Sequence, residues 1–498
     1  MLKHSPNAAL LLCLVICSAG ARAQDAPRAG RLVFEPYGLQ TYDGRTHPAE
    51  LGRLWVRENR ASRSGRLIRL AFVRLKSTAQ TGAPPVVWLA GGPGVPGVGM
   101  ARVPVYFRLF ERLREVADVI LLDQRGTGMS EPNLDCGHAP VPADVFENDR
   151  KWLRAYTALT RACTEGWRAK GVDTAAYTND ANADDLEDLR RALGAERLSL
   201  VGHSYGTVLA QAYLRRHGGR AGRVVFANTE GADNLVALPG VWDLLIRKLS
   251  YFAGRDAASA GDFPDVESLY RRVLDRLERA PLTLTVTDAR AKRPARIRVG
   301  KIGLQFIVRM DMADARTYST LPALFRMIER GDYSVLTKQI ESLYNEFTGR
   351  SPMANGIDCS IGWSAARAAR AASETPGALF SNVNLQWSPG LCQSLGFAGR
   401  GAAQLPRLWS DAPALFISGT LDTNTPPFQA EELRWGFPQS THLVVENGGH
   451  ETLPAEEVQS IIVDFFKGQD VGGRGVRFDP PRFLSVDELK SRGAGGRR

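Results

Sequence analysis

The first half of the chain alternates short apolar runs with segments whose apolar residues recur every three or four positions. Residues 31–77 hold two or three strand-like runs, which we interpret as an antiparallel edge leading into a sheet. Later runs are short and continuously apolar, which is typical of strands covered on both faces. Alternation of such strands with helices predicts an α/β fold with a mostly parallel sheet and helices on both faces. The continuous runs lie at 85–90, 117–122, 198–201 and 224–227.

The alternation stops near residue 235, and the pattern becomes mainly helical until about residue 405. It resumes with apolar runs at 414–418 and 442–446 and a helical pattern at 456–466. Strand–helix alternation on both sides of a helical block predicts a core interrupted by a large inserted cap. The predicted division is a core at 24–234 and 406–470, a helical cap at 235–405, and a loosely ordered tail at 471–498, which is rich in Gly, Arg and Pro.

Residues 1–23 have the pattern of a signal peptide. A short polar start precedes an apolar run at 8–19, and Ala21-Arg22-Ala23 has the small-residue spacing of a cleavage site. The apolar run is too short to span a bilayer comfortably, and no later stretch is long and apolar enough for a membrane helix. We therefore expect an exported protein, periplasmic or secreted, with no stable membrane insertion.

The composition is that of a folded globular protein. The chain has 498 residues, of which 44% are hydrophobic and 23% charged, and its formal net charge is +10. A basic balance raises the question of nucleic-acid binding, but the arginines are scattered and no basic stripe is interleaved with aromatic residues. We expect no nucleic-acid partner. The oligomeric state is left open.

Four cysteines remain after the two in the predicted signal peptide are set aside, and an even number in an exported chain suggests two disulfides. Three pairings are possible. Closure of short loops favours Cys136–Cys163 and Cys359–Cys392. Each disulfide closes a loop of roughly 30 residues and should add about 3 kcal/mol to the free energy of unfolding. The spacings match no zinc pattern, and no metal is expected.

The sequence Gly-His-Ser-Tyr-Gly at 202–206 stands between an apolar strand and an amphipathic helix. This is the G-x-S-x-G pattern in the context that exposes a nucleophilic serine on a sharp strand-to-helix turn. Ser204 is the candidate nucleophile. The backbone N–H of Tyr205 then lies at a helix N-terminus, where it can stabilise an oxyanion.

A serine nucleophile needs a base, usually a histidine, which is oriented in turn by a carboxylate. His450 lies in a glycine-bearing loop directly after a predicted strand, and Asp422 follows the strand before it. The chain order Ser204, Asp422, His450 is that of the α/β hydrolases. The long interval between Ser204 and Asp422 leaves room for the cap. The other six histidines stand in less suitable settings: His4, His47, His138, His203, His217 and His442.

A second oxyanion donor is expected from the loop that follows the strand at 85–90. Gly-Gly-Pro-Gly at 91–94 is that loop, and we assign the N–H of Gly92. No Gly-Lys-Ser/Thr follows the glycines, so a phosphate-binding P-loop is excluded. The chemistry of these residues calls for no cofactor.

Taken together, five motifs resemble the proline iminopeptidase and tripeptidyl aminopeptidase family of α/β hydrolases, and the likeness extends over most of residues 65–470. The exported, cysteine-bearing chain with a long cap is more similar to the secreted tripeptidyl aminopeptidases. One departure is Ala90, where the family usually has a polar residue. The motifs are Gly-Gly-Pro-Gly at 91–94, Asp-Gln-Arg-Gly-Thr-Gly-x-Ser at 123–130, Gly-His-Ser-Tyr-Gly at 202–206, Gly-x-x-Asp-x-x-Thr-Pro at 419–426 and Gly-Gly-His at 448–450.

The resemblance implies an aminopeptidase that releases N-terminal residues or short peptides through an acyl-enzyme on Ser204. Such an enzyme needs a carboxylate to receive the substrate's α-ammonium group, and Glu230, at a strand end before the cap, is the candidate. A turn carboxylate that bonds only to backbone is an equal alternative for Glu230. An esterase or amidase acting on small acyl compounds would use the same serine, and a non-catalytic binding protein on a hydrolase scaffold is the third hypothesis.

Overall fold

The computed structural model describes residues 27–62, 65–79, 81–231, 233, 235–256, 259–386, 389–397 and 407–492. The signal peptide predicted at 1–23 lies outside the described residues. No helix in the described ranges is long and apolar enough to cross a membrane.

The core is a mixed sheet, for which ten strands are described, in the order β1-β2-β3-β5-β4-β6-β7-β10-β11-β12. The pairings β1–β2, β2–β3 and β3–β5 are antiparallel, and every pairing from β5 to β12 is parallel. The predicted antiparallel edge and mostly parallel sheet are thus confirmed. The strands are β1 (Leu32–Gln40), β2 (Thr46–Arg57), β3 (Leu67–Leu75), β4 (Val86–Leu89), β5 (Val119–Asp123), β6 (Leu198–His203), β7 (Ala221–Ala227), β10 (Ala414–Gly419), β11 (Ser440–Glu446) and β12 (Val476–Arg477).

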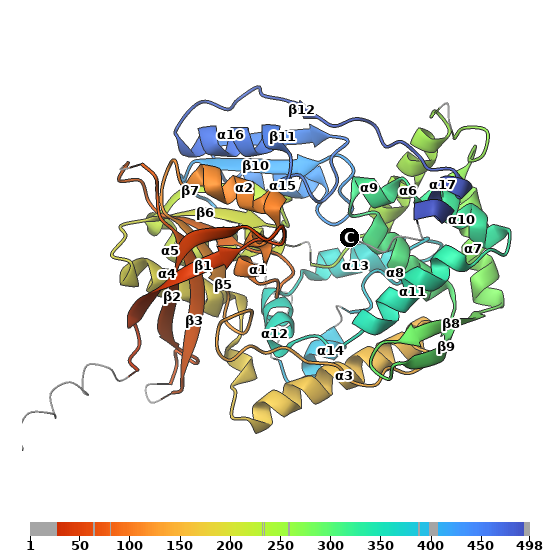
Figure 1. Ribbon diagram of the computed structural model, residues 1–498, viewed down its shortest axis with the longest axis horizontal. Helices are drawn as coiled ribbons and strands as arrows, with labels where there is room; N and C mark the ends of the chain where they lie inside the picture. The colour runs from red at the N-terminus through yellow and green to blue at the C-terminus, as the bar shows by residue number, and fades with distance from the viewer. Residues whose placement is uncertain are drawn as a thin grey trace, which may run out of the picture.

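Helices cover both faces of this sheet (Figure 1), because the central strands are apolar on both sides. One face packs against α1 (Gly97–Ala101), α2 (Pro104–Leu113) and α16 (Glu456–Phe466). The other packs against α4 (Asn179–Ala192), α5 (Tyr205–His217) and α15 (Pro427–Arg434). Two short 3₁₀ turns, η1 (Thr174–Ala176) and η2 (Gly218–Arg220), complete the connections. The predicted α/β-hydrolase fold class is confirmed.

Beside the sheet lies a mainly helical cap with a hydrophobic core of its own, on the right in Figure 1. Its one hairpin within the described residues, β8–β9, is antiparallel. The elements are α6 (Pro239–Ala253), α7 (Val266–Arg279), β8 (Leu282–Asp288), β9 (Arg293–Val299), α8 (Lys301–Asp311), α9 (Ala315–Tyr318), α10 (Leu321–Glu329), α11 (Ser334–Glu346), α12 (Pro352–Ile361), α13 (Ala365–Glu374) and α14 (Pro389–Ser394).

The predicted domain boundaries need two corrections. Helix α3 (Asp149–Ala169) precedes the predicted cap in sequence, yet its residues Trp152 and Tyr156 are buried in the cap core. Helix α12 lies inside the predicted cap, yet Met353 and Ile357 are buried against the sheet helices. In each case the apolar face of a helix packs where a complementary apolar surface is available, whatever its place in the chain.

The prediction of a loosely ordered tail is wrong for residues 471–492. Strand β12 pairs with β11, and α17 (Val486–Arg492) ends the described chain beside α10 and α11 of the cap. Figure 1 shows the chain crossing from the sheet to the cap between these two elements. Phe483, Leu484 and Leu489 are buried in the cap core, which accounts for the order of a segment rich in Gly and Arg. Residues 493–498 lie outside the described part.

Candidate active site

Ser204 stands at the turn between β6 and α5, in a backbone conformation that non-glycine residues rarely adopt. Its φ is 53° and its ψ is −124°, so the turn is strained. The N–H of Ser204 donates to the carbonyl oxygen of Ala227 at 3.0 Å, which ties the turn to the end of β7. Within the described residues, the Ser204 hydroxyl makes no hydrogen bond and faces a cavity. The turn therefore presents the hydroxyl as the sequence pattern predicts.

The two glycines of the motif are required by close backbone approach. A Cβ at Gly206 would overlap the carbonyl of Leu89 at the end of β4, and a Cβ at Gly202 would lie 2.6 Å from the carbonyl oxygen of Gly206. Real Cβ atoms do not approach backbone so closely, so a larger residue at either place would push the serine turn out of position.

Asp422 and His450 are in contact. Nδ1 of His450 lies 2.9 Å from Oδ2 of Asp422 and 3.1 Å from its Oδ1. The aspartate follows β10, the histidine follows β11, and these strands are parallel neighbours, so both loops leave the same edge of the sheet. That edge also carries Ser204 after β6. The structure thus places the three predicted residues at one sheet edge, two of them hydrogen-bonded.

The carboxylate of Asp422 is fully buried but well satisfied. It accepts hydrogen bonds from the N–H groups of Asn424 and Thr425 at 2.9 Å and from the Thr425 hydroxyl at 2.6 Å. Burial acts to raise the pKa of Asp422, but His450 and these donors outweigh it and lower the pKa to about 2. Burial acts to lower the pKa of His450, but the adjacent Asp422 charge raises it above its usual value. This pairing orients a histidine that can take up a proton.

Three of the other described histidines are engaged elsewhere. His203 is buried against Trp88, with its ring 5.3 Å from that of His450 and its Nε2 3.4 Å from the His450 carbonyl oxygen. Burial lowers the pKa of His203 to about 3, so it stays neutral behind the candidate base. His442 pairs with Glu431, and His217 pairs with Asp184.

The predicted oxyanion donors lie next to the serine. Gly92 and Tyr205 line the same cavity as Ser204, and a Cβ added to the adjoining Gly91 would lie 3.0 Å from the Ser204 Cβ. The N–H of Tyr205 is in the first turn of α5 and has no partner within the helix. Gly92 has φ of 109°, which a glycine adopts at little cost. Two backbone donors therefore flank the candidate nucleophile.

The cavity that contains Ser204 has a volume of about 220 Å³ and carries four charged side chains. Arg350 and Asp358 form an ion pair, with Nη2 and Oδ2 2.5 Å apart. Arg309 lies over the Trp242 ring, 5.6 Å from its centroid, and burial and the nearby Arg350 lower its pKa to about 10. Leucine, alanine, tryptophan and isoleucine side chains supply the apolar part of the wall: Leu235, Ala237, Trp242 and Ile361.

Glu230 is the fourth charged residue, and it lies two residues after Asn228 at the end of β7. Its backbone is bonded to Thr207 and Gln211, but within the described chain neither oxygen of its carboxylate has a hydrogen-bond or ion-pair partner. Burial, then the neighbouring Asp358, raises the pKa of Glu230 to about 7. The alternative of a turn carboxylate that bonds only to backbone does not fit a side chain that lines the cavity.

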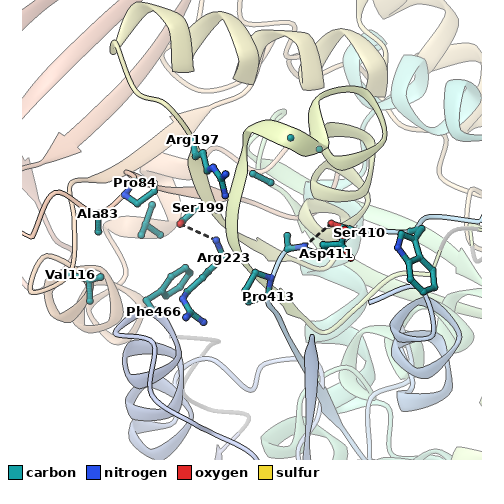
Figure 2. A pocket seen from close by; sticks show the side chains of 17 residues that line it. Ala83, Pro84, Val116, Arg197, Ser199, Arg223, Ser410, Asp411, Pro413 and Phe466 are labelled. Atoms are coloured by element: carbon teal, nitrogen blue, oxygen red, sulfur yellow. Dashed lines mark hydrogen bonds between the residues drawn. The ribbon is translucent and has the colours of Figure 1, made fainter. Parts of the chain in front are cut away.

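A larger cavity of about 690 Å³ lies at the opposite edge of the sheet. Figure 2 shows that it is bordered by Pro84, Ser199 and Pro413, which stand at the amino ends of parallel strands, together with Arg197 and Arg223. Neither Ser204 nor Asp422 nor His450 borders it. In folds of this kind the chemistry is found at the carboxyl ends of the strands, so the smaller cavity is the candidate active site.

Both disulfides have the predicted pairing. Cys136 joins Cys163 and Cys359 joins Cys392, with Cα–Cα distances of 5.2 and 5.7 Å. The second links α12 to α14, and Cys359 is the neighbour of the cavity residue Asp358. Among the described residues, no cluster of His, Cys, Asp or Glu side chains has the arrangement of a metal site.

Several residues of the site carried no recognisable sequence signal. Arg309, Arg350 and Asp358 come from the cap, where helical periodicity says nothing about which charges face a cavity. Asn228 had one available signal, because it is a polar residue at the carboxyl end of a parallel strand, as are Asp422 and His450. Sequence reasoning passed over it in favour of Glu230.

Two family profiles match the chain. The family described as alpha/beta hydrolase fold matches residues 84–300, and the family described as TAP-like protein matches residues 379–475. The two segments are the first part of the core with the start of the cap, and the second part of the core with the end of the cap. They include Ser204, Asp422 and His450.

Three curated relatives resemble parts of the chain. Putative hydrolase YuaR of Escherichia coli (strain K12) is 29% identical over 174 residues, covering 34% of this chain and 32% of the relative. Tripeptidyl aminopeptidase of Streptomyces coelicolor is 32% identical over 178 residues, covering 33% of this chain and 32% of the relative. Serine protease Hip1 of Mycobacterium bovis is 30% identical over 175 residues, covering 32% of each. The chain therefore spans about a third of the length of these relatives.

The comparisons agree with the architecture and with the resemblance seen in the sequence motifs. The first profile, described as alpha/beta hydrolase fold, includes the serine turn after β6. The second, described as TAP-like protein, includes the loops after β10 and β11. The chain has the α/β-hydrolase fold, and its sequence is similar to the family described as TAP-like protein and to the tripeptidyl aminopeptidases.

Proposed function

We propose that the protein is a serine hydrolase, and within that class an aminopeptidase that releases N-terminal residues or short peptides. The observation that carries the proposal is the 2.9 Å contact between His450 and Asp422 at the sheet edge that also presents the unbonded Ser204 hydroxyl to a cavity. A binding protein on a hydrolase scaffold has no need of a strained serine turn and a buried, oriented histidine together.

The proposed reaction begins with attack of Ser204 Oγ on the substrate carbonyl carbon, while His450 takes up the hydroxyl proton. Asp422 holds the imidazole by Nδ1 and stabilises its protonated form. The N–H groups of Gly92 and Tyr205 stabilise the negative oxygen of the tetrahedral intermediate. His450 then gives the proton to the leaving amine, and water releases the acyl group from Ser204 by the same route.

The choice of an aminopeptidase rests on Glu230. A buried carboxylate without a partner is costly, and a cation that meets it in the bound state removes that cost. Arg350 in the same cavity is already paired with Asp358. The α-ammonium group of a peptide is a cation of suitable size, and a cavity of about 220 Å³ suits a short N-terminal segment rather than an extended chain.

The alternative is an esterase or amidase that acts on small acyl compounds. The apolar part of the cavity wall, with Trp242 and Leu235, would accept an acyl chain as well as a peptide side chain. The two proposals differ in their use of Glu230, since an uncharged acyl group gains nothing from a carboxylate.

Kinetics on matched free and N-acetylated peptide arylamides test the choice. Acetylation of the substrate should lower kcat/KM about a hundredfold or more, because it removes the charge that Glu230 receives. Glu230→Gln should reproduce part of that loss on the free substrate and have little effect on the acetylated one. Equal rates on the two substrates would overturn the aminopeptidase proposal and favour the esterase or amidase.

We also propose that the protein works in an exported, oxidising compartment. The two disulfides support this, because such bonds persist in the periplasm or outside the cell and are rare in the cytosol. Fractionation of cells that produce the full chain, followed by thiol labelling, tests it. Recovery in the cytosol with the thiols of Cys136, Cys163, Cys359 and Cys392 all free would contradict the proposal.

A further inference from the structure

Asn228 stands directly after β7 and is fully buried. Its φ is 51°, which is uncommon for a residue other than glycine, although asparagine tolerates it better than most. Its own N–H donates to the carbonyl oxygen of Ile417 in β10 at 2.7 Å, and the residue before it accepts from the N–H of Ser204. The end of β7 is therefore bonded on one side to the serine turn and on the other to the strand that leads to Asp422.

The side chain of Asn228 contacts both remaining loops of the candidate site. Its Nδ2 donates to Oδ2 of Asp422 at 3.0 Å and lies 3.3 Å from the carbonyl oxygen of Gly449, the residue before His450. Its Oδ1 accepts from the hydroxyl of Thr452 at 2.8 Å. A carboxylate and a carbonyl accept only, so the orientation of the amide is determined by its partners.

The uncharged amide of Asn228 donates a hydrogen bond to the buried carboxylate of Asp422. Asp422 is removed from water, and each donor to its oxygens favours the ionised form that His450 needs beside it. Apart from His450, the other donors to Asp422 come from its own turn, residues 424 and 425, whereas Asn228 reaches it from a different strand. Asn228 thus forms a second link between the Asp422 loop and the His450 loop, beside the direct contact of the two side chains.

We propose that Asn228 is a positioning residue for the hydrolytic reaction: its amide orients Asp422 toward His450 and joins the loops that carry them. This inference rests on the proposed serine hydrolase function. Asn228 touches no reacting atom, and its effect on the reaction passes through Asp422 and the Gly449 carbonyl.

Two substitutions separate positioning from a purely structural role. Asn228→Gly keeps the positive φ and removes the amide. Asn228→Asp keeps the shape but replaces the donor by a second carboxyl group 3.0 Å from Asp422, and like charges so close alter each other's protonation. Asn447→Gly is the matched control. Asn447 also has a positive φ, of 59°, and a side-chain amide that donates to the carbonyl oxygen of Phe478, but within the described residues it makes no hydrogen bond to Asp422.

The measurement is the rate of labelling of the folded protein by a fluorophosphonate, followed against pH, with thermal unfolding recorded in parallel. Asn228→Gly should react about tenfold to a hundredfold more slowly. A loss of this order is typical when a hydrogen bond that supports catalysis is removed. Asn228→Asp should also move the acid limb of the rate profile upward by at least about half a pH unit. Asn447→Gly should keep the rate within about threefold, whatever its unfolding temperature.

The outcomes distinguish this inference from the proposed function. Failure of the unmodified protein to be labelled at Ser204, with Ser204→Ala as the blank, would overturn both. Normal labelling of both Asn228 variants with an unshifted profile would overturn the role of Asn228 alone. If Asn447→Gly is labelled as slowly as Asn228→Gly, removal of any hydrogen bond in these loops slows the reaction. That result would also overturn the specific role of Asn228.

Discussion

Arg350 and Asp358 form an ion pair, Nη2 to Oδ2 2.5 Å, in the wall of the cavity that holds Ser204. Their side chains are 20% and 7% exposed, so both charges lie largely out of contact with water. Asp358 also raises the pKa of Glu230 and Arg350 lowers it, which links the pair to the carboxylate proposed to bind the substrate amine. The pair therefore contributes both to stability and to the charge of the site.

Removing one partner of this pair should destabilise the protein more than removing both. Asp358→Asn leaves a buried guanidinium uncompensated, at a cost of about 3 kcal/mol, whereas Arg350→Met with Asp358→Asn leaves no charge to compensate. Thermal or urea unfolding of the two single variants and the double variant measures the coupling. Additive losses would show that the ion pair contributes nothing as a pair.

Replacement of the candidate nucleophile or base should abolish most turnover without unfolding the protein. Ser204→Ala and His450→Ala should each lower kcat on the order of 10⁴-fold or more, and Asp422→Ala somewhat less. Because the three act as one unit, the double variant Ser204→Ala/His450→Ala should be no slower than the slower single variant. Circular dichroism serves as the control for folding, and a double variant far below both single variants would contradict the shared mechanism.

The activity should fall as the pH is lowered through the neutral range. His450 acts as a base only when neutral, and the Asp422 charge raises its pKa, so the acid limb lies above the usual histidine value. Glu230 binds an ammonium group only when ionised, and its pKa of about 7 in the unoccupied cavity gives a loss in the same direction. Asp422, with a pKa of about 2, stays ionised throughout.

A pH profile of kcat/KM on a free peptide arylamide, repeated with Glu230→Gln, separates the two groups. The variant should be slower but keep a single acid limb due to His450. A profile that is flat from pH 5 to pH 8 would exclude His450 as the base.

The two disulfides should differ in their effect on substrate binding. Replacing either pair by serines should lower the free energy of unfolding by about 3 kcal/mol, because each closes a loop of similar length. Only Cys359–Cys392 adjoins a cavity residue, Asp358, so only its loss should also raise KM. Unfolding in urea and steady-state kinetics on the two double variants measure both effects, and an equal rise in KM for both would contradict the distinction.

The elements whose signals are local could be predicted from the sequence alone. Continuous apolar runs mark strands buried on both faces, and Gly-His-Ser-Tyr-Gly after such a run marks the serine turn. Asp422 and His450 could be predicted because each follows a strand of a parallel sheet, and all such strands end at one edge. The disulfide pairing followed from loop closure, which also depends on separation along the chain.

The way in which distant segments share a core could not be predicted from the sequence. Helix α3 and the segment around Phe483 join the cap, and α12 joins the sheet, because burial of an apolar face depends on which surfaces meet and not on sequence order. For the same reason, the sequence did not predict that Arg309, Arg350 and Asp358 line the cavity. The packing of the cap places them there. Asn228 carried a strand-end signal, but its importance lies in two hydrogen bonds to residues about 200 positions away, and such long-range contacts leave no local pattern.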